Sequence, residues 1–294
     1  MTLFMHKSIF LMIFAIIVLF ILYFNGKPVF MIKKIKKLRD QKPRKKKKFG
    51  QHFLRKQSVV DNMINKVLIT DNTRVMEIGC GDGFLTQAIL NQTNCKELWV
   101  YEIDPEWANL VGKKISDSRL KIKIENILEV DFDFLEKYKP WVLLANLPYQ
   151  ITFPIFFKIQ KNKHLFEEGV VMIQEEVAQK IVAKSGKNYN ATSIFLQYHF
   201  HFELMEKIEP GAFNPPPKVF SRLIYFKPKK DILKINDETE FWKFLKLCFK
   251  FPRRTIYNNL RQTHYDLSKI PESILKLRAQ QISFNDFIKF WNLL

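Results

Sequence analysis

The residues with the clearest chemical meaning are Asn146, Leu147, Pro148 and Tyr149, which follow a short apolar run. An adenine N6 amine is a poor nucleophile because its lone pair is delocalised into the ring. Hydrogen-bond acceptors aimed at its two hydrogens can draw that lone pair out of conjugation. We interpret the Asn146 side-chain oxygen and a main-chain carbonyl at Leu147 or Pro148 as such acceptors. Tyr149 would stack on the base. The alternative is an Asn-Pro turn with a packed tyrosine.

A second motif is the glycine loop Gly79-Cys80-Gly81-Asp82-Gly83, which lies between an apolar run and a helical pattern. Glycines let the backbone approach a ligand, and a helix N-terminus offers N–H groups that are not used within the helix. A dinucleotide fingerprint would place its third glycine at position 84, where this chain has Phe84. The spacing favours a nucleoside-sulfonium ligand, with Gly79 and Gly81 as candidate contacts.

An acidic residue, Glu102, stands at the end of the second apolar run. In nucleotide-binding sheets an acid at this place accepts hydrogen bonds from both ribose hydroxyls. The alternative is a solvated acid at a strand end. Asp104, two residues further on, is predicted instead to cap a helix that begins at Pro105.

These motifs need a scaffold that brings them together, and the alternation of short apolar runs with helix-length segments predicts one. The predicted strands are 74–78, 98–103, 120–124, 141–145 and 170–173, and the predicted helices include 84–91, 105–114 and 175–184. Strands that alternate with helices indicate an α/β fold, a parallel sheet covered on both faces. Ligands bind such sheets at the carboxyl ends of the strands, where Gly79, Glu102 and Asn146 are expected.

The pattern changes in the last third of the chain. Residues 199–208 and 222–226 are predicted as two strands flanking a proline-rich turn, so we expect an antiparallel pair at the end of the sheet. Helical segments follow at 240–249, 253–263, 271–277 and 284–294. We therefore predict a catalytic domain over 49–228 and a small all-helical domain over 229–294.

The charge is large and unevenly distributed. Forty-eight Lys and Arg against 29 Asp and Glu leave a net charge of +19. The stretch 31–48 carries a net +10 and residues 210–294 a net +9, whereas residues 49–209 sum to −2. This layout predicts a polyanionic partner, held by an arm and by the C-terminal domain around a nearly neutral catalytic domain. The three cysteines, Cys80, Cys95 and Cys248, have neither metal-ligand nor disulfide-framework spacing, so we expect no metal and a reducing compartment.

The first thirty residues need a separate interpretation, because residues 9–24 form a run of sixteen without a charge. That length is short of the roughly 20 residues that comfortably span a bilayer. Translation beginning at Met31, a membrane anchor and an organellar leader are all compatible with it. Membrane contact is expected only if this segment belongs to the mature protein, and the enzyme domain would then face the cytoplasm.

With these motifs in place, the chain resembles the ribosomal RNA adenine N6-dimethyltransferases, in particular the small-subunit, KsgA-type branch. The resemblance runs from about Lys47 to Leu294 and adds two motifs, residues 49–54 (FGQHFL) and 213–219 (FNPPPKV). It implies a Rossmann-like class I methyltransferase sheet and S-adenosylmethionine as the methyl donor. The implied product is two adjacent dimethylated adenines in the hairpin loop near the 3′ end of small-subunit RNA, within a pre-ribosomal particle. We expect a cytoplasmic monomer.

The resemblance also implies roles for individual residues. Cofactor contacts carry over to His52, Leu54, Gly79, Gly81, Glu102, Asn126, Ile127 and Asn146. Two of these depart from the family pattern, because His52 replaces an asparagine and Asn126 an aspartate. An amide is a weaker acceptor than a carboxylate for the cofactor's exocyclic amine. Phe213 resembles the aromatic that stacks on the target base opposite Tyr149, and its polar flanks favour a surface loop. The alternative is a core phenylalanine.

RNA contacts are predicted at basic positions outside the catalytic motifs. The candidates are Lys45, Lys46, Lys47, Lys48, Arg222, Arg253 and Arg254. For each arginine the alternative is a solvated basic surface. Three other functions stay open at this point: a large-subunit methyltransferase of the macrolide-resistance type, a non-catalytic RNA-binding assembly factor on the same fold, and a membrane-tethered scaffold that rests only on residues 9–24. The proline-rich 213–219 segment favours the small-subunit branch, and the presence of Glu102 and Asn146 favours an enzyme.

Overall fold

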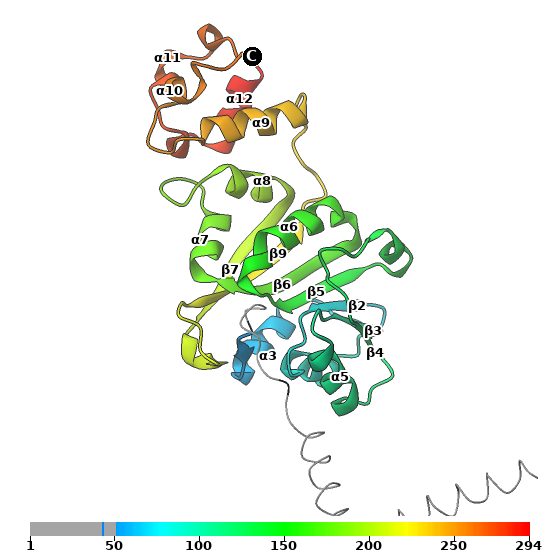
Figure 1. Ribbon diagram of the computed structural model, residues 1–294. Helices are drawn as coiled ribbons and strands as arrows, with labels where there is room; N and C mark the ends of the chain where they lie inside the picture. Colours follow the sequence, from blue (N-terminus) through cyan, green and yellow to red (C-terminus); the bar gives the residue numbers. More distant parts are fainter. Residues whose placement is uncertain (1–42, 44–50) are drawn as a thin grey trace, which may run out of the picture. The chain divides into compact units, whose positions relative to one another are not determined.

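The computed structural model describes residue 43 and residues 51–294, and Figure 1 shows their arrangement. The expectations for residues 1–30 and for Lys45, Lys46, Lys47 and Lys48 fall outside the described residues. Seven strands form one sheet in the order β4-β3-β2-β5-β6-β9-β7. Their bounds are β2 Arg74–Ile78, β3 Glu97–Tyr101, β4 Leu120–Lys123, β5 Trp141–Asn146, β6 Phe166–Gln174, β7 Phe200–Ile208 and β9 Ser221–Pro228.

The direction of the strands divides this sheet into two parts. From β4 to β6 every neighbouring pair is parallel, whereas β9 runs antiparallel to both β6 and β7. The predicted parallel sheet and the predicted antiparallel pair at its end are therefore confirmed. Parallel strands place all their carboxyl ends at one edge, so the loops after β2, β3 and β5 come together there.

Helices cover both faces of the sheet (Figure 1). Successive side chains of a strand point to opposite faces, so apolar side chains on both faces must be buried. Val142 and Leu144 of β5 join one buried apolar cluster, and Leu143 and Ala145 join the other. The first cluster takes residues from α3 Gln57–Asn65, α4 Phe84–Gln92 and α5 Pro105–Lys114. The second takes residues from α6 Thr152–Lys161, α7 Glu175–Val182 and α8 Ala191–His199.

The sequence patterns located most of these elements. The strand 74–78 and the helix 105–114 have the predicted bounds, and Asp104 caps α5 by accepting a hydrogen bond from the Glu106 amide at 3.1 Å. Helices α3, α6 and α8 were not predicted. Helix α8 begins at a local cap, because Asn190 accepts hydrogen bonds from the amides of Thr192 and Ser193.

The C-terminal helices surround a third apolar cluster. They are α9 Glu238–Cys248, α10 Ile256–Leu260, α11 Glu272–Leu275 and α12 Phe284–Trp291. The helix predicted over 253–263 is shorter than expected, because Thr255 caps α10 by accepting a hydrogen bond from the Asn258 amide. Arg253 and Arg254 therefore lie in the loop before the helix. Tyr198 of α8 belongs to the same cluster, so this part packs directly on the sheet domain.

Short elements complete the described chain. A two-stranded antiparallel pair joins β1 Phe53–Leu54 to β8 Phe213–Asn214. The 3-10 helices are η2 Asp133–Tyr138, η3 Tyr149–Ile151, η4 Lys163–Leu165, η5 Pro210–Ala212, η6 Leu267–Lys269 and η7 Ala279–Gln281. Within the described residues, no helix combines the length and apolar character that crossing a bilayer requires. The same residues contain no cluster of three or more His, Cys, Asp and Glu that could hold a metal.

Candidate active site

A pocket opens at the carboxyl edge of the parallel strands, between the loops that follow β2, β3, β4 and β5. Its walls include all the predicted cofactor contacts and the whole predicted catalytic loop: His52, Leu54, Gly79, Gly81, Glu102, Asn126, Ile127, Asn146, Leu147, Pro148 and Tyr149. Residues up to about 100 positions apart in sequence thus share one pocket. The topology brings the separate motifs together, as the α/β prediction requires.

The glycine loop after β2 forms one wall with a backbone that other residues rarely adopt. Gly79 and Gly81 have φ values of +77° and +53°, in the left-handed region that favours glycine. A Cβ atom on Gly81 would lie 2.7 Å from the Phe53 ring, so any side chain there would displace that ring. The loop therefore presents bare backbone to the pocket and leads directly into α4.

Glu102 lies directly after β3 and is buried, with 6% of its surface exposed. One carboxylate oxygen accepts a hydrogen bond from the Asp104 amide at 2.9 Å, and the other accepts one from the Gly81 amide at 3.2 Å. Burial raises the pKa of the Glu102 carboxyl, and these two amides counteract the rise. The two bonds fix the carboxylate at the pocket wall, where its remaining lone pairs can accept hydroxyl groups.

Asn146, the last residue of β5, is held in one orientation. Its Nδ2 atom donates a hydrogen bond to the main-chain carbonyl of His52 at 3.0 Å. Because the donor end of the amide is used, the acceptor oxygen Oδ1 is the end that remains for a ligand. The sequence predicted the acceptor. It gave no sign that His52, 94 residues earlier, would orient it.

The residues after Asn146 are positioned by neighbouring backbone and by one hydroxyl. The Leu147 amide donates to the Met172 carbonyl at 3.1 Å, and the Leu147 side chain is buried. The Pro148 carbonyl already accepts the Ile151 amide at 3.1 Å. Of the two carbonyls that the sequence analysis considered, that of Leu147 is therefore the better candidate for an acceptor.

The ring of Tyr149 is a half-buried wall of the pocket. Its hydroxyl is paired with the hydroxyl of Ser221 at 2.7 Å, which fixes the ring from the side of β9. The His52 ring lies nearly parallel to it, with the ring centroids 6.2 Å apart and an interplanar angle of 22°. His52 Nδ1 is within 2.9 Å of the Pro215 carbonyl. Two flat rings therefore face the same pocket.

The predicted surface position of Phe213 is wrong, whereas its stacking on the target base stays a prediction. The sequence placed its ring on a surface loop opposite Tyr149, but only 4% of the residue is exposed. In β8 it pairs with Leu54 of β1, and both belong to the apolar cluster formed with α3, α4 and α5. Burying a phenylalanine in this cluster is more favourable than exposing it. In this structure Phe213 is a core phenylalanine, the alternative given for it from the sequence.

Asn126 and Ile127 lie in the turn after β4. The Asn126 Oδ1 atom accepts the Leu128 amide at 3.2 Å, and its Nδ2 atom donates to Glu129 at 2.6 Å. Asn126 therefore stabilises its own turn as well as lining the pocket. Ile127 is 4% exposed and presents an apolar surface at the same wall.

Glu77, in β2 beneath the glycine loop, is a pocket residue that the sequence patterns did not predict. It is completely buried and lines the pocket. Thr86 donates its hydroxyl proton to Glu77 Oε2 at 2.7 Å, while Oε1 has no hydrogen-bond partner among the described residues. Burial raises the pKa of this carboxyl to about 8. The available signal was a single acid inside the apolar strand Arg-Val-Met-Glu-Ile.

The predicted RNA-contacting arginines fall into two groups. Arg222 donates two hydrogen bonds to the Glu175 carboxylate, at 2.6 and 2.8 Å, and a third to the Met205 carbonyl. The Arg222 guanidinium therefore already binds a carboxylate and a carbonyl within the protein, which argues against its predicted role as a phosphate contact. Arg253 and Arg254 are exposed in the loop before α10.

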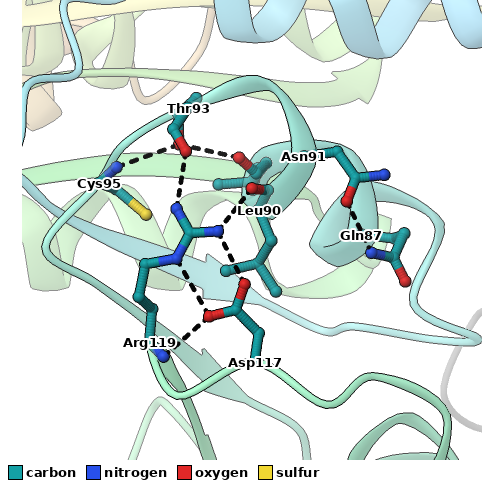
Figure 2. A network of polar contacts seen from close by, with 8 residues as sticks. Gln87, Leu90, Asn91, Thr93, Cys95, Asp117 and Arg119 are labelled. Carbon is teal, nitrogen blue, oxygen red and sulfur yellow. Dashed lines mark hydrogen bonds and ion pairs between the residues drawn. The ribbon is translucent and has the colours of Figure 1, made fainter.

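Arg119 shows the same internal use of an arginine (Figure 2). Its guanidinium donates to Asp117 and to the carbonyls of Leu90 and Thr93, which ties the turn before β4 to the end of α4. Arg55 and Arg74 are likewise paired with Asp82 and Glu97. The arginines of the catalytic domain are therefore used within it.

Comparison with known proteins identifies the family. The model of the family described as "Ribosomal RNA adenine dimethylase" matches residues 42–287. "Ribosomal RNA small subunit methyltransferase A" of Mycoplasma mobile is 35% identical over 256 residues, covering 84% of this chain and 98% of the relative. The protein of the same name from Mesomycoplasma hyopneumoniae is 37% identical over 255 residues, covering 85% and 96%.

Solved structures agree with this assignment. A dimethyladenosine transferase from Plasmodium falciparum is similar with a TM-score of 0.68 and 25% identity, covering 81% of this chain and 96% of that one. The 23S rRNA methyltransferase ErmE has the same TM-score at 19% identity, covering 82% and 99%, and shows the shared fold alone. The chain belongs to the ribosomal RNA adenine dimethylase family, whose members transfer methyl groups from S-adenosylmethionine to adenine in ribosomal RNA.

Proposed function

We propose that this enzyme dimethylates N6 of two adjacent adenines in the 3′-terminal hairpin loop of small-subunit ribosomal RNA, in a pre-ribosomal particle. The observation that carries the proposal is the oriented Asn146 amide, whose Oδ1 atom is left as acceptor beside the glycine loop and Glu102. Relatives named for the small subunit, at 35% and 37% identity, support the choice of RNA.

The pocket fits S-adenosylmethionine. The close approach at Gly81 leaves room only for backbone, and Glu77 Oε1 is a buried polar atom without a hydrogen-bond partner among the described residues. Glu102 would accept the ribose hydroxyls, and Ile127 and Asn126 would contact the adenine ring and its amine. His52, Leu54 and Gly79 would complete the enclosure. When bound, S-adenosylmethionine supplies a methyl group on a positively charged sulfur.

Catalysis would rest on positioning and electrostatics. Asn146 Oδ1 and the Leu147 carbonyl would accept the two N6 hydrogens of the target adenine and so localise its lone pair. Pro148 restricts the backbone between these acceptors and Tyr149. The N6 proton becomes acidic as the nitrogen acquires positive charge, so water can remove it and no strong general base is required. The monomethylated amine would react a second time in the same geometry.

The target adenine would be held by flat surfaces. Tyr149 offers one face, fixed by its hydroxyl contact with Ser221. Because Phe213 is buried, the residue that the geometry offers for the opposite side is His52, whose ring lies nearly parallel to that of Tyr149. Stacking of a base on such a ring contributes about 1 to 3 kcal/mol.

The RNA backbone would be held outside this pocket. Arg253 and Arg254 remain proposed phosphate contacts, together with the lysines of the basic arm, Lys45 to Lys48. Arg222 is not needed for this role, because Glu175 holds its guanidinium. We propose a monomer acting on one assembly particle at a time.

A methyl-transfer assay with isolated subunits tests the proposal. The purified full chain is incubated with labelled S-adenosylmethionine and with small subunits that lack the hairpin modification, with large subunits in parallel. We expect two methyl groups on each of two adjacent hairpin adenines, and none with the Asn146→Ala variant. Transfer to large-subunit RNA alone would favour the macrolide-resistance type of activity. Binding of small subunits without any transfer would favour an assembly factor.

A further inference from the structure

The arginines of the helical domain differ from those of the catalytic domain in their partners. Arg55, Arg74, Arg119 and Arg222 each form an ion pair with a carboxylate. Among residues 51–294, none of the arginines after Pro228 does so; these are Arg253, Arg254, Arg261 and Arg278. The segment 250–264 contains no Asp or Glu at all. Its cations are therefore available to an anionic partner.

The loop that presents these cations is held in place by one buried side chain. Asn259 of α10 is 8% exposed, and its Oδ1 atom accepts the Phe251 amide at 3.0 Å. Its Nδ2 atom lies within hydrogen-bonding distance of the carbonyls of Phe251, Thr255 and Arg254, at 3.2, 3.2 and 3.4 Å. The Ile256 amide donates to the Leu277 carbonyl at 2.7 Å. The loop 250–255 is thus preorganised by its own contacts.

Two aromatic rings are exposed on and beside this loop. Phe251 is 42% exposed and Tyr257 is 49% exposed, although a third apolar cluster lies close by in the same domain. The Arg254 guanidinium lies 4.3 Å from the centroid of the Phe251 ring, and the Lys250 ammonium lies 5.4 Å from it. An exposed phenylalanine ring among unpaired cations is a combination that suits nucleic acid. The bases of a nucleic acid can stack on the ring, and its phosphates attract the cations.

We propose that Phe251, exposed in the loop 250–255, stacks on an unpaired RNA base beside the phosphates proposed to be held by Arg253 and Arg254. This inference rests on the proposed function only for the identity of the RNA. RNA is favoured over a membrane surface because the loop is short and rigid and carries one ring between cations. A membrane-binding segment would instead present a broad apolar face.

The test separates stacking from charge. The dissociation constant of the 3′-terminal hairpin RNA is measured for the full chain over a series of KCl concentrations. Phe251→Leu keeps an apolar side chain and removes the ring, so we expect binding weaker by about 5- to 150-fold at every salt concentration. The logarithmic salt slope should not change, because no charge is removed.

Arg253→Gln should have the complementary effect. It removes one cation, so the magnitude of the salt slope should fall by up to about 0.7 to 0.9 for a lost phosphate contact. Two matched controls should leave binding unchanged. Phe134→Leu alters a ring that is 41% exposed in the catalytic domain, and Lys276→Gln alters a cation that is already paired with Glu272.

Two results would overturn the inference. One is a Phe251→Leu variant that binds the RNA as tightly as the Phe134→Leu control. The other is a Phe251→Leu variant with normal RNA binding that is retained less well on vesicles of phosphatidylserine and phosphatidylcholine, which would make the loop a membrane contact. Methyl transfer by the unaltered protein is measured separately. If the unaltered protein binds the RNA but transfers no methyl group, the proposed function is contradicted and the role of Phe251 is not.

Discussion

The buried carboxyl of Glu77 predicts a specific pH dependence of stability. Its pKa is raised from an ordinary value of 4.5 to about 8, and burial is the main cause. At neutral pH the carboxyl is therefore protonated in the folded chain and ionised in the unfolded chain. The folded state binds the additional proton, so the free energy of unfolding must fall as the pH rises from about 4.5 to about 8.

The magnitude follows from the size of this change. At 1.36 kcal/mol per pKa unit, a rise from 4.5 to about 8 corresponds to roughly 5 kcal/mol over the whole range. Glu77→Gln keeps an oxygen that can accept the Thr86 hydroxyl and removes the ionisation. We expect the variant to lose less stability between pH 5 and pH 8 than the unaltered protein, by several kcal/mol. The pKa of Glu102 is also raised, so a smaller pH dependence of stability should remain in both the unaltered protein and the Glu77→Gln variant.

Urea denaturation of the full chain, followed by circular dichroism at a series of pH values, measures this difference. Glu176→Gln is the matched control, because the Glu176 side chain is 75% exposed and lies on the surface of α7. Identical pH dependence in the Glu77→Gln variant and in the unaltered protein would refute the reasoning. Glu77 would then be ionised in the folded state, and a cation or water would have to satisfy Oε1.

Three further predictions concern catalysis and RNA binding. Asn146→Ala should abolish detectable methyl transfer, because losing one transition-state contact alone costs about 100- to 1000-fold, with RNA affinity nearly unchanged; equal loss of both in a folded variant would contradict its role. Replacing Lys45 to Lys48 with alanine should raise the Michaelis constant for the small subunit at unchanged turnover, and an unaltered salt dependence would exclude the arm from RNA binding. The fragment Met31–Leu294 should be soluble and fully active in the same assay, because the motifs with chemical content follow Phe49; failure to bind S-adenosylmethionine, with binding by the full chain, would make residues 1–30 functional.

The parts of the site that the sequence predicted are those encoded locally. Gly79, Glu102 and Asn146 each end a strand whose apolar pattern is visible in a few residues, and the parallel topology then brings them to one edge. The cap at Asp104 was predictable for the same reason, because it depends only on its neighbours.

The parts that the sequence did not predict depend on contacts between distant residues. Phe213 is buried because β8 pairs with β1, a two-residue contact between segments about 160 positions apart. Arg222 is bound by Glu175, 47 positions earlier, and no local pattern distinguishes it from an arginine that meets RNA. The orientation of Asn146 by the His52 carbonyl is a third example.

The most direct test of the central claim is mass spectrometry of the 3′-terminal fragment of small-subunit RNA from cells with and without this gene. We predict two adjacent N6,N6-dimethyladenines in the hairpin loop when the gene is present. Both should be unmethylated when it is deleted, and both should return on expression of the unaltered protein but not of Asn146→Ala. An identical hairpin in the two strains, or a modification that changes only in large-subunit RNA, would contradict the assignment to the small subunit.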